Sequence, residues 1–419
     1  MNELNDESAD LYCGGGGSTT GIELAEECLG MIPTTKTAIN HWQLAIDTHA
    51  MYHPDVRHKC ANVDNLDPRA VIPGGRLKLL WGSPECVHHS NARGGKPRSD
   101  QSRASAWQIA RWAEALYIGR IIIENVEEFR SWCPLDEEGQ PIWKLKGQTY
   151  LAFLRSLRSL GYHVQDRVLC CADYGDATSR QRLFILAHRG RKVRWPEPLY
   201  SKHGTATLFG KQPKWRAARE IIDWNLKGET IFGRKRPLVP KTIHQIEKGL
   251  SKYGGQPFII KMDQGGSLHS LDDPMVTITT ADAFGLAEPF LVEYYGTGHP
   301  VSLDDPLPTQ TTKDRFGLVM PVVETRDGRQ YLDIRFRMLT PGELAAATSL
   351  PYVPLGNREE KVIQIGNAVP VYTAAALAIA QLAETTKEME NALQRLFALQ
   401  QERRNLALSP KTTAIPAPA

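Results

Sequence analysis

The first half of the chain alternates short apolar runs with segments of helical periodicity. Six short runs read as strands, of which the second is weaker: residues 11–13, 36–40, 77–81, 121–123, 164–169 and 183–187. Three segments carry apolar residues at helical spacing: residues 22–30, 108–117 and 150–160. Gly30 and Gly161 provide the stops of two of these helices. This alternation predicts an α/β fold, in which helices cover both faces of a parallel sheet.

The character of the chain changes near Arg189. From there to about Arg337 it is rich in Pro, Gly, Thr and basic residues, with few helical patterns. Three short stretches recur 32 positions further on: residues 257–260 at 289–292, 270–274 at 302–306, and 284–286 at 316–318. A third copy begins at Pro321. The repeat predicts a small β domain that arose by duplication.

Helical patterns return after Arg337, at residues 341–348 and 371–383, and a charged helix with an apolar stripe is expected at 385–406. The Pro-, Ala- and Thr-rich residues 409–419 are expected to be disordered. We therefore divide the chain into four parts. They are an α/β domain (1–189), a β-rich insert (190–336), a return to the α/β domain (337–384), and a terminal helix with its tail (385–419).

Composition narrows the class of protein. Of the 419 residues, 42% are hydrophobic and 23% are charged, which is ordinary for a soluble globular protein. The formal net charge of +3 is too small to indicate nucleic-acid binding by itself. The seven scattered cysteines form no CxxC pair, which argues against a disulfide framework or a zinc ribbon and favours a reducing, intracellular setting. The apolar runs are too short to span a membrane.

Reactive side chains follow two of the predicted strands. Cys86 lies in a tight loop after residues 77–81, and Glu124 follows three isoleucines. A carboxylate at the end of a buried run is costly unless it is paired, so Glu124 is expected to be functional or salt-bridged. A thiol and an acid at neighbouring strand ends suit covalent attack on an electron-poor ring. Taken alone, Cys86 fits a packed structural thiol better, since that is the commoner fate of a buried cysteine.

Two further features are weaker when taken singly. Four glycines at residues 14–17 permit a tight turn against a ligand at a helix N-terminus, although linkers contain such runs as well. Arg180 and Arg182 are separated by one residue, which on an extended segment places both guanidinium groups on one side. A solvated basic edge would show the same spacing. The group His41, His49, His53, His58 and Cys60 fits no standard zinc pattern, so no metal is expected.

In their order along the chain, these motifs resemble those of the DNA (cytosine-5)-methyltransferase family. Six stretches carry the resemblance: residues 11–17, 84–86, 124–126, 178–182, 337–343 and 366–370. The spacing of Asp100 and Arg103 resembles a charged pair that follows the family's cysteine loop. The resemblance covers about residues 10–189 and 337–380. It implies a Rossmann-like domain that uses S-adenosylmethionine, with the β-rich insert as a target-recognition domain.

The resemblance also implies a mechanism. Cys86 would add to C6 of a cytosine that has flipped out of the duplex, which activates C5 for methylation. Glu124 would protonate or hydrogen-bond N3 and the amino group. Arg180 and Arg182 would hold O2, the adjacent phosphate and the thiolate, and Asn125 would orient the loop. After methyl transfer a base removes the C5 proton and the thiol leaves.

Binding roles follow from the same resemblance. The residues implied in S-adenosylmethionine binding are Tyr12, Gly14, Gly16, Gly17, Asn40, His41, Asp64, Pro84, Asn367 and Val369. A loop at residues 87–103 would close on DNA, and its implied DNA contacts are Ser90, Arg93, Arg98 and Arg103.

Three positions depart from the family pattern. Glu85 replaces the proline before the cysteine, and its carboxylate should raise the thiol pKa unless an arginine offsets it. Thr178 replaces a glutamine. Asn40 stands where an acidic residue usually binds the cofactor ribose, so it would do so without charge assistance.

These observations lead to one expectation and two alternatives. We expect an enzyme that methylates C5 of cytosine at a specific site in duplex DNA, acting as a monomer in the cytoplasm of a bacterial or phage-infected cell. The first alternative keeps the fold but changes the transferred group or uses RNA. The second is a DNA-binding regulator without catalysis. The presence of Cys86, Glu124, Arg180, Arg182 and Asn367 together argues against that regulator.

Overall fold

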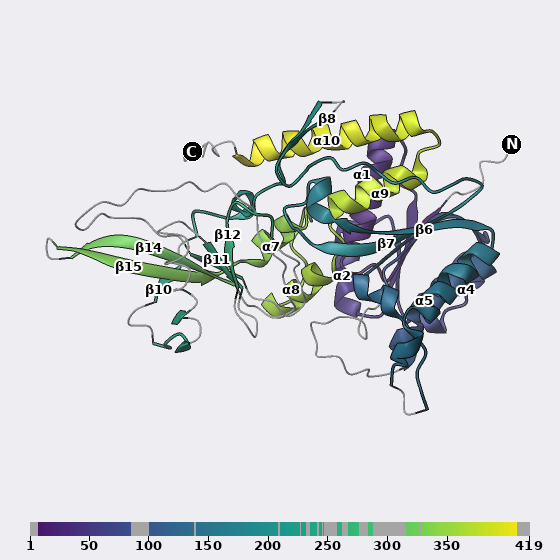
Figure 1. Cartoon of the computed structure of the whole chain (residues 1–419), viewed down its shortest axis with the longest axis horizontal. Coiled ribbons are helices and arrows are strands. Elements are labelled where there is room, and N and C mark those ends of the chain that lie inside the picture. The colour runs from purple at the N-terminus through teal and green to yellow at the C-terminus, as the bar shows by residue number, and fades with distance from the viewer. Residues whose placement is uncertain are drawn as a thin grey trace, which may run out of the picture.

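The computed structural model places an α/β domain beside a β-rich arm. Strands β14 and β15 project from this domain on the side away from helices α4 and α5 (Figure 1). The structure describes residues 7–84, 100–137, 140–207, 210–226, 228–231, 235–240, 243–244, 246, 258–261, 267–275, 284–287, 316–326 and 329–408.

A seven-stranded sheet forms the centre of the α/β domain. Its strands are β1 (Ser8–Leu11), β2 (Thr35–Asn40), β3 (Arg57–Cys60), β4 (Arg76–Gly82), β5 (Tyr117–Asn125), β6 (Tyr162–Cys170) and β7 (Gln181–Arg189). They lie in the order β3-β2-β1-β4-β5-β7-β6. The five strands from β3 to β5 are parallel, but β7 is antiparallel to both of its neighbours. The predicted parallel sheet is therefore wrong at β7, because the connection at 171–180 is too short for a crossover helix.

Helices cover both faces of this sheet. The α-helices are α1 (Gly17–Leu29), α2 (Gln43–Tyr52), α3 (Pro68–Val71), α4 (Asp100–Ala115), α5 (Gln148–Ser159), α7 (Pro341–Ala347), α8 (Arg358–Asn367), α9 (Val371–Leu382) and α10 (Thr386–Leu408). Short 3₁₀ turns lie at Val63–Asn65, Glu127–Ser131, Trp143–Leu145, Cys171–Tyr174 and Ala218–Ile221. Alternate strand residues divide between two cores. Trp81 and Ile122 pack with α1 and α9, whereas Leu80, Ile121 and Ile123 pack with α4 and α5.

Helix α9 is buried at every position and forms the centre of the larger core. By length and composition the stretch 358–382 could cross a membrane, but 89% of its most apolar window is buried inside the protein. The core helix of a globular domain has the same properties. Gly21 of α1 allows the close packing, since an added Cβ there would lie 2.4 Å from the Cβ of Ala374 in α9.

The insert contains a second, six-stranded sheet in its described part. Its strands are β10 (Glu229–Thr230), β11 (Phe258–Lys261), β12 (Ser267–Ser270), β13 (Phe284–Ala287), β14 (Phe316–Arg326) and β15 (Arg329–Met338). A small hairpin pairs β8 (Thr205–Thr207) with β9 (Gly210–Gln212). The repeated Phe-Gly-Leu copies both form strands, and Phe284 pairs directly with Phe316.

The beginning of the insert is integrated with the α/β domain. Trp195, Ala218 and Ile221 belong to the same buried cluster as α1 and α9. Glu220 pairs with Arg216 and with Arg404 of the C-terminal helix, at 3.1 and 2.8 Å. Helix α10 therefore ties this part of the insert to the α/β core.

We predict that Gly21→Ala lowers the free energy of unfolding by about 1–3 kcal/mol, because the new methyl group overpacks the α1–α9 contact. Gly74→Ala is the matched control, since its added Cβ would have no atom within 4 Å. Urea denaturation of the three proteins measures the difference. Equal midpoints for Gly21→Ala and the control would contradict the packing described for α1 and α9.

Candidate active site

The site is built at the carboxyl edge of the parallel strands. The register places Asn40, Leu11, Gly82 and Ile123 near the ends of β2, β1, β4 and β5, in that spatial order. The chain reverses its direction of progress across the sheet between β1 and β4. In open α/β sheets, ligands bind in the crevice at such a switch point.

A turn of glycines follows β1 and starts α1. Gly14 and Gly16 have φ values of +53° and +104°, which side chains other than glycine rarely adopt. A Cβ on Gly17 would lie 2.5 Å from the carbonyl oxygen of Val369. The turn therefore needs glycine both for its conformation and for its contact with the segment after α8.

Two side chains from distant parts of the sequence support this turn. The Tyr352 hydroxyl donates to the Gly15 carbonyl at 2.8 Å, and a Cβ on Gly16 would meet that hydroxyl at 2.6 Å. His53 lies beside them, with Nδ1 3.0 Å from a carboxylate oxygen of Glu23. These supporting contacts could not be predicted from the sequence, since no local motif links residue 352 to the turn.

A buried chain of hydrogen bonds lies beneath the turn. Asp10 accepts from Ser18 and Thr19 at 2.5 and 2.8 Å, and Thr19 contacts His49 at 3.0 Å. His49 in turn contacts His58 at 2.8 Å. Burial raises the pKa of Asp10 to about 6, although the two hydroxyls oppose that shift. Burial also holds the pKa of His49 well below its usual value, and His53 adds to this effect.

The expected cofactor residues lie around the same edge. Tyr12 follows β1 with a φ of 63°, an uncommon value for a residue with a side chain, and its hydroxyl donates to the Ser105 carbonyl at 3.0 Å. Asn40 ends β2, and its side-chain oxygen accepts from the Trp42 N–H at 2.9 Å, while His41 is exposed. One carboxylate oxygen of Asp64 is buried and has no hydrogen-bond partner among the described residues. Such an acceptor fits a ligand that donates a hydrogen bond.

Glu124 and Asn125 occupy the end of β5. Glu124 pairs with Arg182 of β7 at 3.1 Å between Oε1 and Nε, and the exposed fractions of their side chains are 10% and 13%. The expectation that Glu124 would be paired is confirmed. Asn125 donates from Nδ2 to the Pro84 carbonyl at 3.2 Å and accepts from the Val126 N–H at 2.8 Å. Asn125 thereby fixes the backbone directly before Glu85 and Cys86.

Arg180 has a different environment from Arg182. It is buried, and its Nη1 donates to the Gly366 carbonyl at 2.8 Å. Its backbone N–H lies 3.3 Å from the hydroxyl of Thr178, the residue that replaces the family glutamine. The two arginines therefore reach two parts of the site: Arg182 reaches the acid, and Arg180 reaches the end of α8. Asn367 is the last residue of that helix.

Several expected site residues belong to the part of the chain that the structure does not describe. Glu85, Cys86, Ser90, Arg93 and Arg98 lie outside the described residues. The backbone of Arg103 belongs to α4, but its side chain is likewise outside the described part. The roles assigned to these residues remain predictions. Among the described residues, no group of three or more His, Cys, Asp or Glu side chains could hold a metal ion.

The motif at residues 337–343 stabilises the junction where the chain leaves the insert and re-enters the α/β domain. Arg337 binds the Glu343 carboxylate through two nitrogens, at 2.7 and 2.8 Å. Glu343 and Thr340 also form a capping box at the start of α7. Glu343 further accepts from the Asp223 N–H at 2.8 Å. This motif therefore connects the insert to the α/β domain.

Because the pKa of Asp10 is raised in the folded state, we predict that the free energy of unfolding depends on pH. Its pKa is about 6 when folded and near 3.8 when unfolded, so the folded state keeps the proton through this window. The free energy of unfolding should therefore fall as the pH rises from about 4 to about 6, by roughly 3 kcal/mol for this group. Burial also raises the pKa of Asp176 to about 6, which adds a contribution of the same sign.

Asp10→Asn should remove the contribution of Asp10 to the pH dependence of the unfolding free energy and leave the contribution of Asp176. Urea unfolding of both proteins between pH 4.5 and pH 8 checks this expectation. Two parallel curves of unfolding free energy against pH would show that Asp10 does not titrate in this way.

Comparisons with known proteins agree with this geometry. A family model described as C-5 cytosine-specific DNA methylase matches residues 7–382. The type II methylase M.HgiDII of Herpetosiphon aurantiacus is 25% identical over 205 residues, which cover 48% of this chain and 51% of that protein. The type II methyltransferase M.Sau3AI of Staphylococcus aureus is 25% identical over 198 residues, which cover 45% of this chain and 44% of that protein. The chain thus spans about half the length of these curated relatives.

A solved structure shows the same fold. A DNMT2 mutant from Spodoptera frugiperda is 17% identical and has a TM-score of 0.53, with 90% of this chain and 100% of that chain covered. Together the matched range, the glycine turn and the Glu124–Arg182 pair lead to one conclusion. The chain belongs to the family of C-5 cytosine-specific DNA methylases.

Proposed function

We propose that the protein transfers a methyl group from S-adenosylmethionine to C5 of cytosine at a specific site in duplex DNA. The Asn125–Pro84 hydrogen bond is the observation that carries this proposal. It ties the backbone that leads to Cys86 to the strand end that bears Glu124. Cys86, two residues after Pro84, would then lie beside the acid at one edge of the sheet, next to a glycine turn suited to a cofactor.

The residues around the turn fit S-adenosylmethionine. Gly14, Gly16 and Gly17 allow the backbone to approach the ligand closely, and the buried oxygen of Asp64 would accept from an adenine amino group. The Asn40 oxygen accepts from Trp42, which leaves the amide nitrogen as the group that could donate to a ribose hydroxyl. Tyr12, His41, Pro84, Asn367 and Val369 complete the proposed lining. The cofactor, when bound, supplies an electrophilic methyl group.

The chain's own residues activate the base. Cytosine C5 is a weak nucleophile, and addition of the Cys86 thiolate to C6 makes C5 enamine-like. Glu124 holds a proton at N3, which stabilises the negative charge that develops in the ring. Arg182 is positioned by its pair with Glu124 and lies near enough to compensate the charge of that carboxylate. Arg180 holds the Gly366 carbonyl, and through it the end of α8.

The substrate must leave the duplex to reach this edge, since ring carbons are inaccessible within stacked pairs. Ser90, Arg93, Arg98 and Arg103 are proposed to contact phosphates from the loop that follows Cys86. The insert at 190–336 is proposed to read the sequence around the target. A monomer on DNA and a cytoplasmic location in a bacterial or phage-infected cell belong to the same proposal.

Cys86→Ala should abolish 5-methylcytosine formation while DNA binding persists, because the variant lacks only the nucleophile. Bisulfite sequencing of DNA from cells that express each protein would reveal both the activity and the site. Nucleoside mass spectrometry of DNA and RNA would identify the transferred group and the polymer. Full turnover by Cys86→Ala would refute the covalent mechanism.

Arg182→Met should slow alkylation of Cys86 about tenfold at neutral pH, as expected for a thiol pKa raised by one unit. Without the positive charge of Arg182, the negative charges of Glu85 and Glu124 would raise the pKa of the thiol. Iodoacetamide labelling followed by peptide mass spectrometry measures each cysteine separately. Arg155→Met serves as the control, since Arg155 is exposed on α5. Unchanged reactivity would show that Glu85 is turned away from Cys86.

A further inference from the structure

The amino edge of the central sheet carries a row of arginines and tyrosines. Arg76 and Tyr117 begin β4 and β5, whereas Arg189 ends the antiparallel β7 and Tyr162 begins β6. These four strands are neighbours in the order β4-β5-β7-β6. The topology therefore places Arg, Tyr, Arg and Tyr side by side, at the edge opposite the proposed active site.

The side chains of this row are stacked on one another. The guanidinium carbon of Arg76 lies 4.3 Å from the centre of the Tyr117 ring, and that of Arg189 lies 5.2 Å from the same ring. Arg189 also lies 4.4 Å from the centre of the Tyr162 ring. Cation–π contacts of this kind fix the planes of the guanidinium groups but leave their charges uncompensated.

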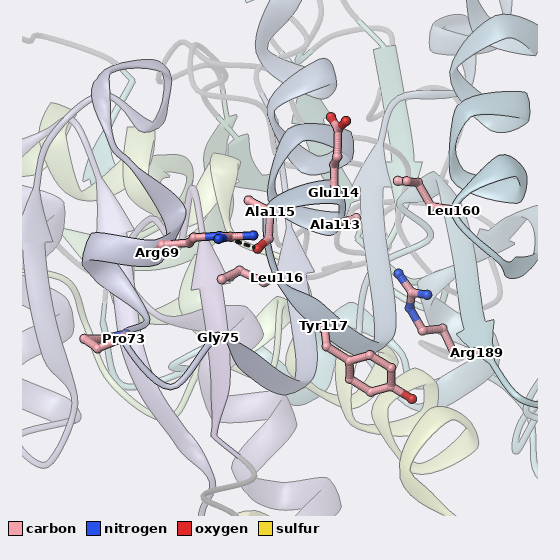
Figure 2. A pocket seen from close by; sticks show the side chains of 10 residues that line it. All are labelled: Arg69, Pro73, Gly75, Ala113, Glu114, Ala115, Leu116, Tyr117, Leu160 and Arg189. Atoms are coloured by element: carbon pink, nitrogen blue, oxygen red, sulfur yellow. Dashed lines mark hydrogen bonds between the residues drawn. The ribbon is translucent and has the colours of Figure 1, made fainter.

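A cavity of about 610 Å³ opens to solvent beside this row. Its lining includes Arg69, Tyr117, Leu160 and Arg189 (Figure 2). Tyr117 is 48% exposed, so part of its ring is open to solvent. The volume is within the range that holds small ligands.

The arginines of this edge have donors to spare. Arg69 uses Nε for the Ala115 carbonyl at 3.1 Å, and Arg189 uses Nε for the Ile118 carbonyl at 3.2 Å. Over the part of the chain that the structure describes, neither arginine has a carboxylate partner, and the same is true of Arg76. Glu114 lines the cavity, but its carboxylate points away from Tyr117 and Arg189 (Figure 2). The terminal nitrogens are thus held in place without an internal anion.

We propose that this edge is a second anion site, which binds phosphate groups. Planar guanidinium groups offer paired N–H donors that match phosphate oxygens, and an exposed ring beside them suits a nucleoside. The phosphate comes either from a free nucleotide or polyphosphate, or from the backbone of a DNA segment that passes the far side of the domain. The site is independent of the proposed methyl transfer, because it uses none of the residues at the carboxyl edge.

The test compares two double variants of the full chain. Arg69→Met/Arg189→Met removes both cavity arginines, and Arg155→Met/Lys202→Met removes the same charge from exposed positions elsewhere. Calorimetric titration with inorganic pyrophosphate at low salt forms the first arm. The cavity variant should bind pyrophosphate at least tenfold more weakly than the control, whose affinity should equal that of the native protein. Thermal unfolding checks that both variants are folded.

A third variant tests the site while both cavity arginines are kept, so that a loss of stability cannot explain its effect. Glu114→Lys changes an exposed side chain at the rim of the cavity, and it should tighten pyrophosphate binding several-fold without disturbing the fold. A structural role of the row alone would leave this affinity unchanged.

The second arm identifies the source of the phosphate. The slope of log affinity against log salt for a long duplex should fall by about one to two in the cavity variant if DNA occupies the site. An unchanged slope together with weakened pyrophosphate binding indicates a free nucleotide or polyphosphate. The proposal is overturned if the cavity variant matches the control in both arms.

Discussion

The close approach of the glycine turn to the segment after α8 is the constraint on which the site depends. Gly17 lies against the Val369 carbonyl, Tyr352 holds the Gly15 carbonyl, and Arg180 holds that of Gly366. These contacts join the first residues of the domain to residues that follow the insert. The glycine turn and the strand ends of the proposed site are consequently complete only when the residues that follow the insert have packed against them. The Arg337–Glu343 pair secures that return.

The two edges of the sheet have different chemistry for a topological reason. Parallel strands collect their carboxyl ends at one edge, where Asn40, Pro84 and Asn125 follow or end β2, β4 and β5. Because β7 is antiparallel to its neighbours, it starts at the carboxyl edge and ends at the amino edge. It contributes Arg182 beside Glu124 at its start and Arg189 beside Tyr117 at its end. One strand of reversed direction thus supplies a cation to each edge.

Much of this arrangement was predictable where the signal is local. The apolar runs of β4 and β5 mark buried strands, and Glu124 after three isoleucines implies a partner. The direction of β7 was not predictable from hydrophobicity, which is the same for either orientation. Helix α2 was missed because it buries Thr48 and His49, which gives a weak periodic pattern. The support from Tyr352 was missed because only tertiary folding brings it to the turn.

The most direct test of the account uses a duplex with 5-fluorocytosine at the target position, together with S-adenosylmethionine. Fluorine at C5 cannot leave as a proton, so an enzyme that adds a thiolate to C6 and transfers the methyl group stays attached to the DNA. The account predicts a denaturation-resistant complex whose cross-linked peptide contains Cys86, and none with Cys86→Ala. A protein that methylates ordinary DNA but forms no such complex, or a complex through another residue, would contradict it.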